Sequence, residues 1–334
     1  MQIRLFALTI VGIMATLLLP TAYTQASDKF KIGWVYAMAN APAIIAESRG
    51  LFAKHGLDVE LRQFNSGPLV KRALAAGDLH MAYIGMPPVY HAYAEGEHLK
   101  IVAKVNYGQA AIITRQNSPI RKLADLRNKR IGNVRNGSGM DVLLRAFILG
   151  ELAGLDSYTD VNIVTMPAKI MQASVQRGLV DAAFTWEPYV AQAIVADDAR
   201  VLFDMNEQLP HYPWYVLVAT ETVLTAQRDK VMRVLKAHEQ AVRILNEEPE
   251  AGTNILIETF NLDNVTSVAG VKTKPIDIVR QARLRLGWES QFKQSDKDFL
   301  QRLINYSLKL GYITKPIRAE DLLDQQAIDS QSSP

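Results

Sequence analysis

Two short segments rich in glycine and serine have the composition and spacing of an anion-binding site. Asn136–Gly139 runs from a predicted strand into a predicted helix, and Ser66–Pro68 has the same arrangement earlier in the chain. Small residues let the backbone approach a ligand closely, and the unpaired N–H groups of a helix's first turn favour negative charge. Each serine is also a good helix cap that needs no ligand. Arg135 would reinforce an anion site unless it is only a surface residue. The pattern predicts binding at Ser66, Gly67, Asn136, Gly137 and Ser138.

Proline and aromatic residues lie where two other predicted strands end. Gly85–Pro88 follows one strand and Trp186–Tyr189 follows another, so the two segments are expected to face each other across a cleft. A tryptophan at a strand end can close over the apolar body of a ligand, although it can also pack under its own helix. Further along, Tyr212 and Tyr215 belong to an aromatic cluster, 211–215, that would serve either ligand contact or hinge packing.

The patterns of catalytic and metal sites do not match. Ser138 lies in Gly-Ser-Gly, which is not the Gly-x-Ser-x-Gly turn of a hydrolase. The histidines form neither an HExxH motif nor another close metal-binding pair, and no phosphate-binding Walker loop is present. The chain has 0 cysteines, which excludes disulfides and thiol chemistry. We therefore expect a binding protein rather than an enzyme, with no cofactor and no metal.

The elements that must position these residues occur twice. Gly77–Val89 and Gly178–Val190 share glycine, alanine, aromatic, proline and valine at a spacing of 101 residues, and Ile32–Val35 recurs as Ile131–Val134 at a spacing of 99. The duplication predicts two similar lobes with a small molecule held between their loops. Chance similarity between two ordinary strand-turn-helix units is the alternative.

Alternation of strands and helices predicts an α/β protein with a mostly parallel sheet in each lobe. The expected strands are 30–36, 57–64, 79–84, 101–105 and 111–114, then 131–134, 161–166, 180–185, 201–204 and 215–219. The expected helices are 42–55, 68–76, one from Pro87 or Pro88, 141–154, 167–177, 228–246, 276–286 and 296–310. Two crossings would divide the chain into a first lobe (27–114), a second lobe (115–212) and a return to the first lobe (213–334). The polar runs 247–250 and 325–334 predict a solvated helix boundary and a frayed end.

The N-terminus predicts export. Arg4 precedes an uncharged apolar run, Leu5–Leu19, and Thr24–Ala26 fits a small-x-small cleavage pattern, so residues 1–26 are expected to be a signal peptide; a retained membrane anchor is the alternative. Lys plus Arg number 37 and Asp plus Glu 34, a near balance that gives no argument for nucleic acid. We expect a monomer that binds a small solute.

On these residues the chain resembles the periplasmic substrate-binding proteins of ABC importers for nitrate, sulfonates and taurine, which are related to thiamine-pyrimidine-precursor binding proteins. The resemblance covers roughly 30–219 and is carried by Gly50–Val59, Ser66–Pro68, Ala76–Asp78, Gly85–Pro88, Ser118–Leu126, Gly137–Ser138 and Trp186–Tyr189.

The resemblance implies a two-lobed periplasmic-binding-protein type II fold and the transmembrane subunits of an ABC permease as partners. It implies ligand contacts at Ala39, Asn40, Ser66, Gly67, Gly85, Met86, Gly137, Ser138, Trp186, Tyr212 and Tyr215. Taurine binders place a carboxylate near the second crossing, where this chain has Tyr212–Tyr215, so a sulfonate, a nitrate-like anion or a small aromatic solute is expected instead. A pyrimidine-synthase-like enzyme and a sensory module on the same fold are the alternatives.

Overall fold

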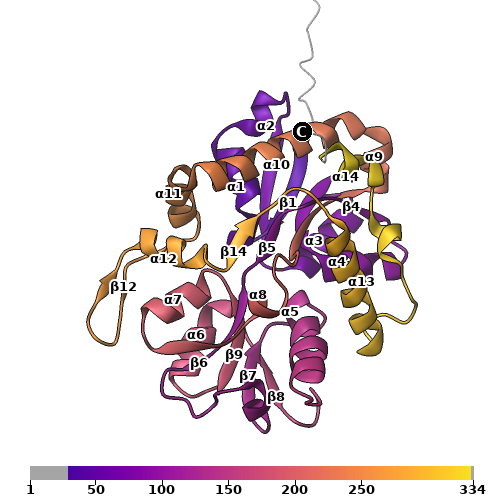
Figure 1. The fold of residues 1–334 in the computed structure, drawn as a ribbon. Coiled ribbons are helices and arrows are strands. Elements are labelled where there is room, and N and C mark those ends of the chain that lie inside the picture. Colours follow the sequence, from indigo (N-terminus) through magenta and orange to yellow (C-terminus); the bar gives the residue numbers. More distant parts are fainter. Residues whose placement is uncertain (1–28, 332–334) are drawn as a thin grey trace, which may run out of the picture.

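The computed structural model describes residues 29–331, so the predicted signal peptide lies outside the described residues. Two lobes, each built on a five-stranded sheet with helices on its faces, lie one above the other (Figure 1). Across this described part, none of the helices combines the length and apolar character that crossing a bilayer requires.

The first lobe is organised by a mostly parallel sheet, as predicted. Its strands are, in sheet order, β2 (Val59–Phe64), β1 (Phe30–Val35), β3 (Met81–Gly85), β11 (Tyr215–Thr220) and β4 (Leu99–Lys104). Only β11 runs against the other four strands.

The second lobe repeats this plan. Its strands are β8 (Asn162–Thr165), β7 (Arg130–Asn133), β9 (Ala182–Trp186), β6 (Ala110–Arg115) and β10 (Ala199–Asp204), and only β6 is antiparallel to the rest. Gly33 of β1 lies opposite Ala82, and Gly132 of β7 lies opposite Ala183 in the matching place. The duplication predicted from the sequence is confirmed at the level of strand order and register.

The antiparallel strand of each sheet is the one that arrives directly from the other lobe. The predicted boundary left 111–114 in the first lobe, which is wrong, because β6 pairs with β9 and β10. The crossing comes earlier, after the short strand β5 (Asn106–Gly108), where Gly108 and Gln109 take positive φ angles of 70° and 114°. The apolar pattern of 110–113 predicts a buried strand but does not say which sheet buries it.

The helices around the first sheet start from local signals, above all proline in the first turn of five of them. They are η1 (Met38–Asn40), α1 (Ala41–Ser48), α2 (Leu51–Lys54), α3 (Gly67–Ala75), α4 (Met86–Ala94), α9 (Glu221–Ala226), α10 (Arg228–Glu247), α11 (Pro249–Thr259), α12 (Pro275–Ala282), α13 (Gln294–Lys309), η5 (Ala319–Leu322) and α14 (Gln325–Ser330). Three short strands accompany them: β12 (Val265–Thr266), β13 (Lys272–Thr273) and β14 (Leu286–Trp288).

The second sheet carries shorter helical elements. They are η2 (Leu123–Leu126), α5 (Gly139–Val142), the π-helical segment η3 (Leu143–Leu152), η4 (Ala168–Ile170), α6 (Met171–Gln176), α7 (Tyr189–Val195) and α8 (Met205–Gln208).

Three local predictions are corrected, and a fourth is confirmed. The helix expected over 42–55 is two helices, because Gly50 takes a left-handed φ of 63° between them. The helix expected to reach 286 ends at Ala282, since Leu286 pairs with β5. The solvated helix boundary expected at 247–250 is confirmed, because α10 ends at Glu247, α11 starts at Pro249 and all four residues are exposed. The tail is ordered rather than frayed through α14, because Asp324 Oδ1 accepts from the Ala327 backbone N–H at 2.9 Å and caps that helix.

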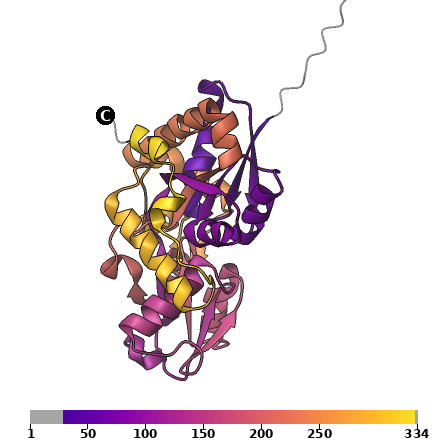
Figure 2. The same cartoon turned by 90° about the vertical axis from the view of Figure 1, so that its right-hand side faces the viewer.

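The C-terminal helix α13 lies against both lobes, and Figure 2 shows this part of the chain, in yellow, running along their side. Phe299 packs on Tyr212 with ring centroids 5.7 Å apart. About one turn further along the helix, Arg302 forms an ion pair with Glu151 of η3, and the Tyr306 hydroxyl donates to the same carboxylate. The lobes are therefore joined by α13 in addition to the two crossings expected from the sequence.

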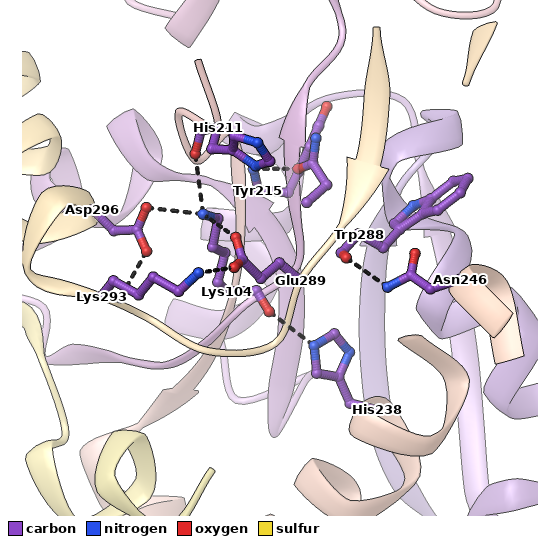
Figure 3. A network of polar contacts seen from close by, with 10 residues as sticks. Lys104, His211, Tyr215, His238, Asn246, Trp288, Glu289, Lys293 and Asp296 are labelled. Atoms are coloured by element: carbon purple, nitrogen blue, oxygen red, sulfur yellow. Dashed lines mark hydrogen bonds and ion pairs between the residues drawn. The ribbon is translucent and has the colours of Figure 1, made fainter. Parts of the chain in front are cut away.

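A buried ion-pair cluster fixes the crossing segments where β4 ends (Figure 3). Lys104, 1% exposed, places its Nζ 2.7 Å from Glu289 Oε2 and 2.9 Å from Asp296 Oδ1, and donates to the His211 carbonyl at 3.1 Å. A buried ammonium needs such partners, because an unpaired one would strongly destabilise the fold. Lys104 precedes the first crossing, His211 lies in the second and Asp296 is in α13, so one side chain holds all three segments.

Candidate functional site: a cavity between the lobes

A cavity of about 140 Å³ lies between the two sheets and is lined from both lobes; we call it the interlobe cavity. The ends of β1 and β3, the β2–α3 loop, the segment that enters β11, and α13 contribute from the first lobe. The β7–α5 loop and the end of β9 contribute from the second. Parallel strands that end at one edge bring these loops together, which is where α/β sheets bind ligands.

The structure brings eight of the twelve predicted ligand residues to this cavity. They are Ser66, Gly67, Gly85, Met86, Asn136, Ser138, Trp186 and Tyr215. The predicted facing of the β3 and β9 ends is thereby confirmed, whereas ligand contact at these residues stays a prediction.

Ala39 and Asn40 do not reach the cavity. Both are fully buried in η1, where the Asn40 amide donates to the Val35 carbonyl at 2.7 Å. Trp288 covers this turn and donates its indole N–H to the Ala39 carbonyl at 3.1 Å. The loop that follows β1 is thus closed by a residue far along the chain.

Gly137 and Tyr212 are the other two predicted residues that fall outside the cavity lining. The Gly137 N–H donates to Asp141 Oδ2 at 3.1 Å. The Tyr212 hydroxyl accepts from the Ala110 N–H at 3.4 Å, and its ring packs against Trp214 and Phe299. Hinge packing, one of the two roles left open for the 211–215 cluster, is therefore the role of Tyr212.

The start of α5 is occupied by a carboxylate of the protein itself. Asp141 is fully buried and accepts from Arg145 Nε at 2.9 Å and from Asn133 Nδ2 at 3.2 Å. Ser138 caps the helix, because its Oγ accepts from the Asp141 N–H at 3.2 Å. The expectation that the first-turn amides of this loop are free for a ligand anion is wrong at Gly137.

Arg135 is the charged residue that remains available. It is exposed, its guanidinium has no partner among residues 29–331, and it is the one charged side chain in the lining of the interlobe cavity within that range. Asn65, Ser66 and Asn136 also line the cavity, and their side chains make no hydrogen bond to another residue of the described chain. A cation beside several uncommitted hydrogen-bonding groups suits a small anion.

The two lobes touch beside the cavity. A Cβ atom on Gly139 would lie 3.5 Å from Pro87 Cγ and 3.7 Å from Trp214 Cζ2, both in the first lobe. A Cβ on Gly67 would come within 2.7 Å of Pro88 Cγ. Glycine at position 67 thus permits the close approach of two loops within the first lobe, whereas Gly139 lies at ordinary contact distance from the opposite lobe.

His91 stands behind the Gly137 loop and stays neutral at physiological pH. Burial lowers its pKa to about 4, and the charge of Lys71 acts in the same direction. Its Cε1 would be 3.6 Å from a Cβ on Gly137. The positive charge at the cavity therefore comes from Arg135 and not from this imidazole.

Sequence reasoning missed part of the cavity wall. Phe299 and Leu303 reach it from α13, and Trp214 reaches it from the second crossing. Trp214 belonged to the predicted aromatic cluster without being chosen. The two α13 residues carry no local signal, because they sit in an ordinary amphipathic helix that packs on both lobes.

The pattern that defines the NMT1-like family matches residues 24–257. A candidate aliphatic sulfonates-binding protein of Bacillus subtilis is 28% identical over 270 residues, which are 77% of this chain and 80% of that protein. Among solved structures, the periplasmic aliphatic sulphonate binding protein of Escherichia coli has a TM-score of 0.73 at 21% identity and covers 88% of this chain and 91% of its own. The periplasmic nitrate-binding protein of Synechocystis PCC 6803 has a TM-score of 0.72 at 17% identity and covers 92% and 89%. These likenesses confirm the predicted two-lobed periplasmic-binding-protein fold.

Proposed function

The chain belongs to the NMT1-like family, and on that premise we propose that it is the extracytoplasmic solute-binding component of an ABC importer. It captures a small anionic solute in the interlobe cavity and presents the closed complex to the transmembrane subunits of a permease. Residues 1–26 act as a cleaved signal peptide, which delivers the mature chain to the periplasm.

The observation that carries this proposal is the charge of the interlobe cavity. Both lobes line it, and Arg135 is its one charged side chain among residues 29–331. A cation in a partly desolvated cavity favours an anion over a neutral or cationic solute. The Bacillus subtilis relative and the two structural neighbours carry the names of sulfonate- and nitrate-binding proteins, which agrees with this preference.

Binding rather than catalysis fits the residues at the cavity. In the stretch 29–331, the lining contains no carboxylate, lysine or histidine that would act as a general acid or base. No group of three metal-binding side chains gathers in the same stretch. A thiamine-pyrimidine-precursor or other aromatic solute is the second candidate, since Trp186 and Trp214 offer indole rings.

Calorimetric titration of the mature protein, with a panel of sulfonates, nitrate, carboxylates and pyrimidines, tests the proposal. An anion at a hundredfold excess over its Kd should add about 2.7 kcal/mol to the free energy of unfolding, seen as a rise in Tm. Arg135→Gln should weaken anion binding by tenfold or more, about 1.4 kcal/mol.

Arg177→Gln is the matched control, because Arg177 is exposed in the same lobe and does not line the cavity. It should bind like the wild type. If the pyrimidines bind and no anion does, or if both arginine variants bind anions alike, the proposed function is wrong.

A further inference from the structure

We infer that the solute is a monoanion with a flat aromatic body about the size of one ring, such as an aryl sulfonate or aryl carboxylate. This inference rests on the proposed function, because it concerns the same cavity. The apolar lining of the cavity, in addition to its positive charge, restricts the class of anion that can bind.

Most of the cavity wall is apolar and rigid. The β3–α4 turn brings Met86, Pro87 and Pro88, and the two prolines carry no N–H that could bind an anion. Met140 and Leu143 add apolar surface from the second lobe. A bare inorganic oxyanion would face this surface without hydrogen bonds, at a cost in desolvation. The wall therefore needs a solute with an apolar body.

The aromatic residues of the wall are held in place by other rings. Trp214 packs edge-on against Tyr212 at 5.8 Å and 68°, and Tyr212 in turn contacts Phe299 at 5.7 Å. On the opposite lobe, Trp186 packs edge-on against Tyr189 at 6.2 Å and 70°. These ring contacts hold both indoles in place at the cavity wall, and aromatic rings prefer offset or edge contacts with another ring. Rigid rings from both lobes thus favour a flat guest over a flexible chain.

The volume of the cavity sets the size of that guest. It measures about 140 Å³, close to the roughly 150 Å³ of a dry apolar cavity known to accept benzene. One ring fills this space, which leaves the acidic group of the solute beside the exposed Arg135, whereas a fused ring system exceeds the space.

The polar groups of the cavity determine which charge the solute carries. Arg135 and Asn136 lie on one loop of the second lobe, and Asn65 and Ser66 lie on one loop of the first, so the hydrogen-bonding groups gather in two loops while the other segments are mainly apolar. None of the lining residues in the described chain is an aspartate or glutamate that would pair with an ammonium. A solute that carries both charges would leave its amine unpaired, which disfavours amino sulfonates.

The test compares ligands of matched size in calorimetric titrations of the mature protein. Benzenesulfonate should bind about fivefold more tightly than cyclohexanesulfonate, which has the same carbon count and no flat ring. It should bind more than tenfold more tightly than ethanesulfonate, because the ring buries more apolar surface. Benzoate should bind in the same range, whereas taurine, nitrate and benzylamine should bind far more weakly.

Trp186→Leu and Trp214→Leu add a second measurement. Each should reduce the preference for benzenesulfonate over cyclohexanesulfonate to near unity while ethanesulfonate binding changes little. Far-ultraviolet circular dichroism checks that both variants fold. If either does not, the relative affinities of the wild-type protein for benzenesulfonate and cyclohexanesulfonate decide whether the solute is aromatic.

The outcomes separate the two proposals. Equal or tighter binding of cyclohexanesulfonate, ethanesulfonate or nitrate would overturn the aromatic inference and leave an anion receptor in place. Binding of benzylamine with no binding of any anion would overturn the proposed function itself.

Discussion

Two loops occupy equivalent places in the duplicated fold, but one is buried and the other lines the interlobe cavity. After β1, Tyr36 lines the interlobe cavity, but the next four residues, Ala37–Asn40, are buried, and the Trp288 indole N–H donates to the Ala39 carbonyl. The loop after β7, Arg135–Ser138, stays open, and three of its four residues line the interlobe cavity. The repeated strands therefore fix where a loop begins, and the elements that pack on it decide whether it faces a ligand.

The difference comes from the C-terminal part of the chain, which has no counterpart in the second lobe. β14 supplies Trp288, which closes the first loop, and α13 supplies Phe299 and Leu303, which complete the wall beside the second. Changes that affect only one of the two loops or lobes test this difference.

Trp288→Ala should have the largest effect, because it removes a side chain that is 2% exposed and leaves the Ala39 carbonyl without its donor. We expect a loss of about 4 kcal/mol in the free energy of unfolding, measured by urea denaturation. Trp288→Phe keeps most of the packing and should lose about 1–2 kcal/mol. Similar losses in both variants would show that the hydrogen bond, not the packing, closes the loop.

Acid should weaken the first lobe before the second. Burial lowers the pKa of His238 in α10 to about 4 from an ordinary value of 6.5, and its Nε2 lies 2.9 Å from the Lys104 carbonyl (Figure 3). The folded state favours the neutral ring, so this stability is full above about pH 6.5 and falls as the pH drops towards 4, by up to about 3 kcal/mol.

The sequence from 115 to 210 contains no histidine, so the second lobe lacks this effect. Hydrogen exchange at pH 4.5 should show α10 losing protection relative to the second sheet, and His238→Gln should reduce that change. Equal loss of protection in both lobes of the wild type would contradict the prediction.

Gly139→Leu should hold the lobes apart at the open loop. The Cβ position is already in contact with Pro87 at 3.5 Å, so the further atoms of leucine have no room in the closed form. We expect a penalty on closure of about 2 kcal/mol, seen as weaker ligand binding and a larger radius of gyration by X-ray scattering. Gly139→Ala fits at ordinary contact distance and should close normally.

Ser138→Ala should have the smallest effect, a loss of about 1 kcal/mol in the free energy of unfolding, because its Oγ caps α5. Ser66→Ala is the matched control, since Ser66 precedes α3 without a side-chain cap bond. That change should stay within about 0.5 kcal/mol. If the two serines cost the same, capping is not what distinguishes the loops.

The sequence predicted the strand-end residues of the site well, because alternating strands and helices place such residues at one edge of a sheet. Gly85 and Trp186 were found in this way. Asn40 does not line the cavity because Trp288, which is distant in the chain, covers its turn, and Gly137 lies outside the lining with its N–H bonded to Asp141. Neither partner has a local signal in the sequence. Leu303 was missed because a helix's local pattern shows only that one face is buried. The order of strands and helices could therefore be predicted from local sequence, whereas contacts between segments distant in the chain could not.

The reach of α13 across both lobes has a consequence for how the protein is made. The cavity wall begins at Val35 and is finished by Leu303, which lies near the end of the chain. A ribosome releases residues in order, so a nascent chain that lacks α13 has both sheets but only part of its interlobe cavity. The complete cavity is therefore confined to molecules whose synthesis has passed α13.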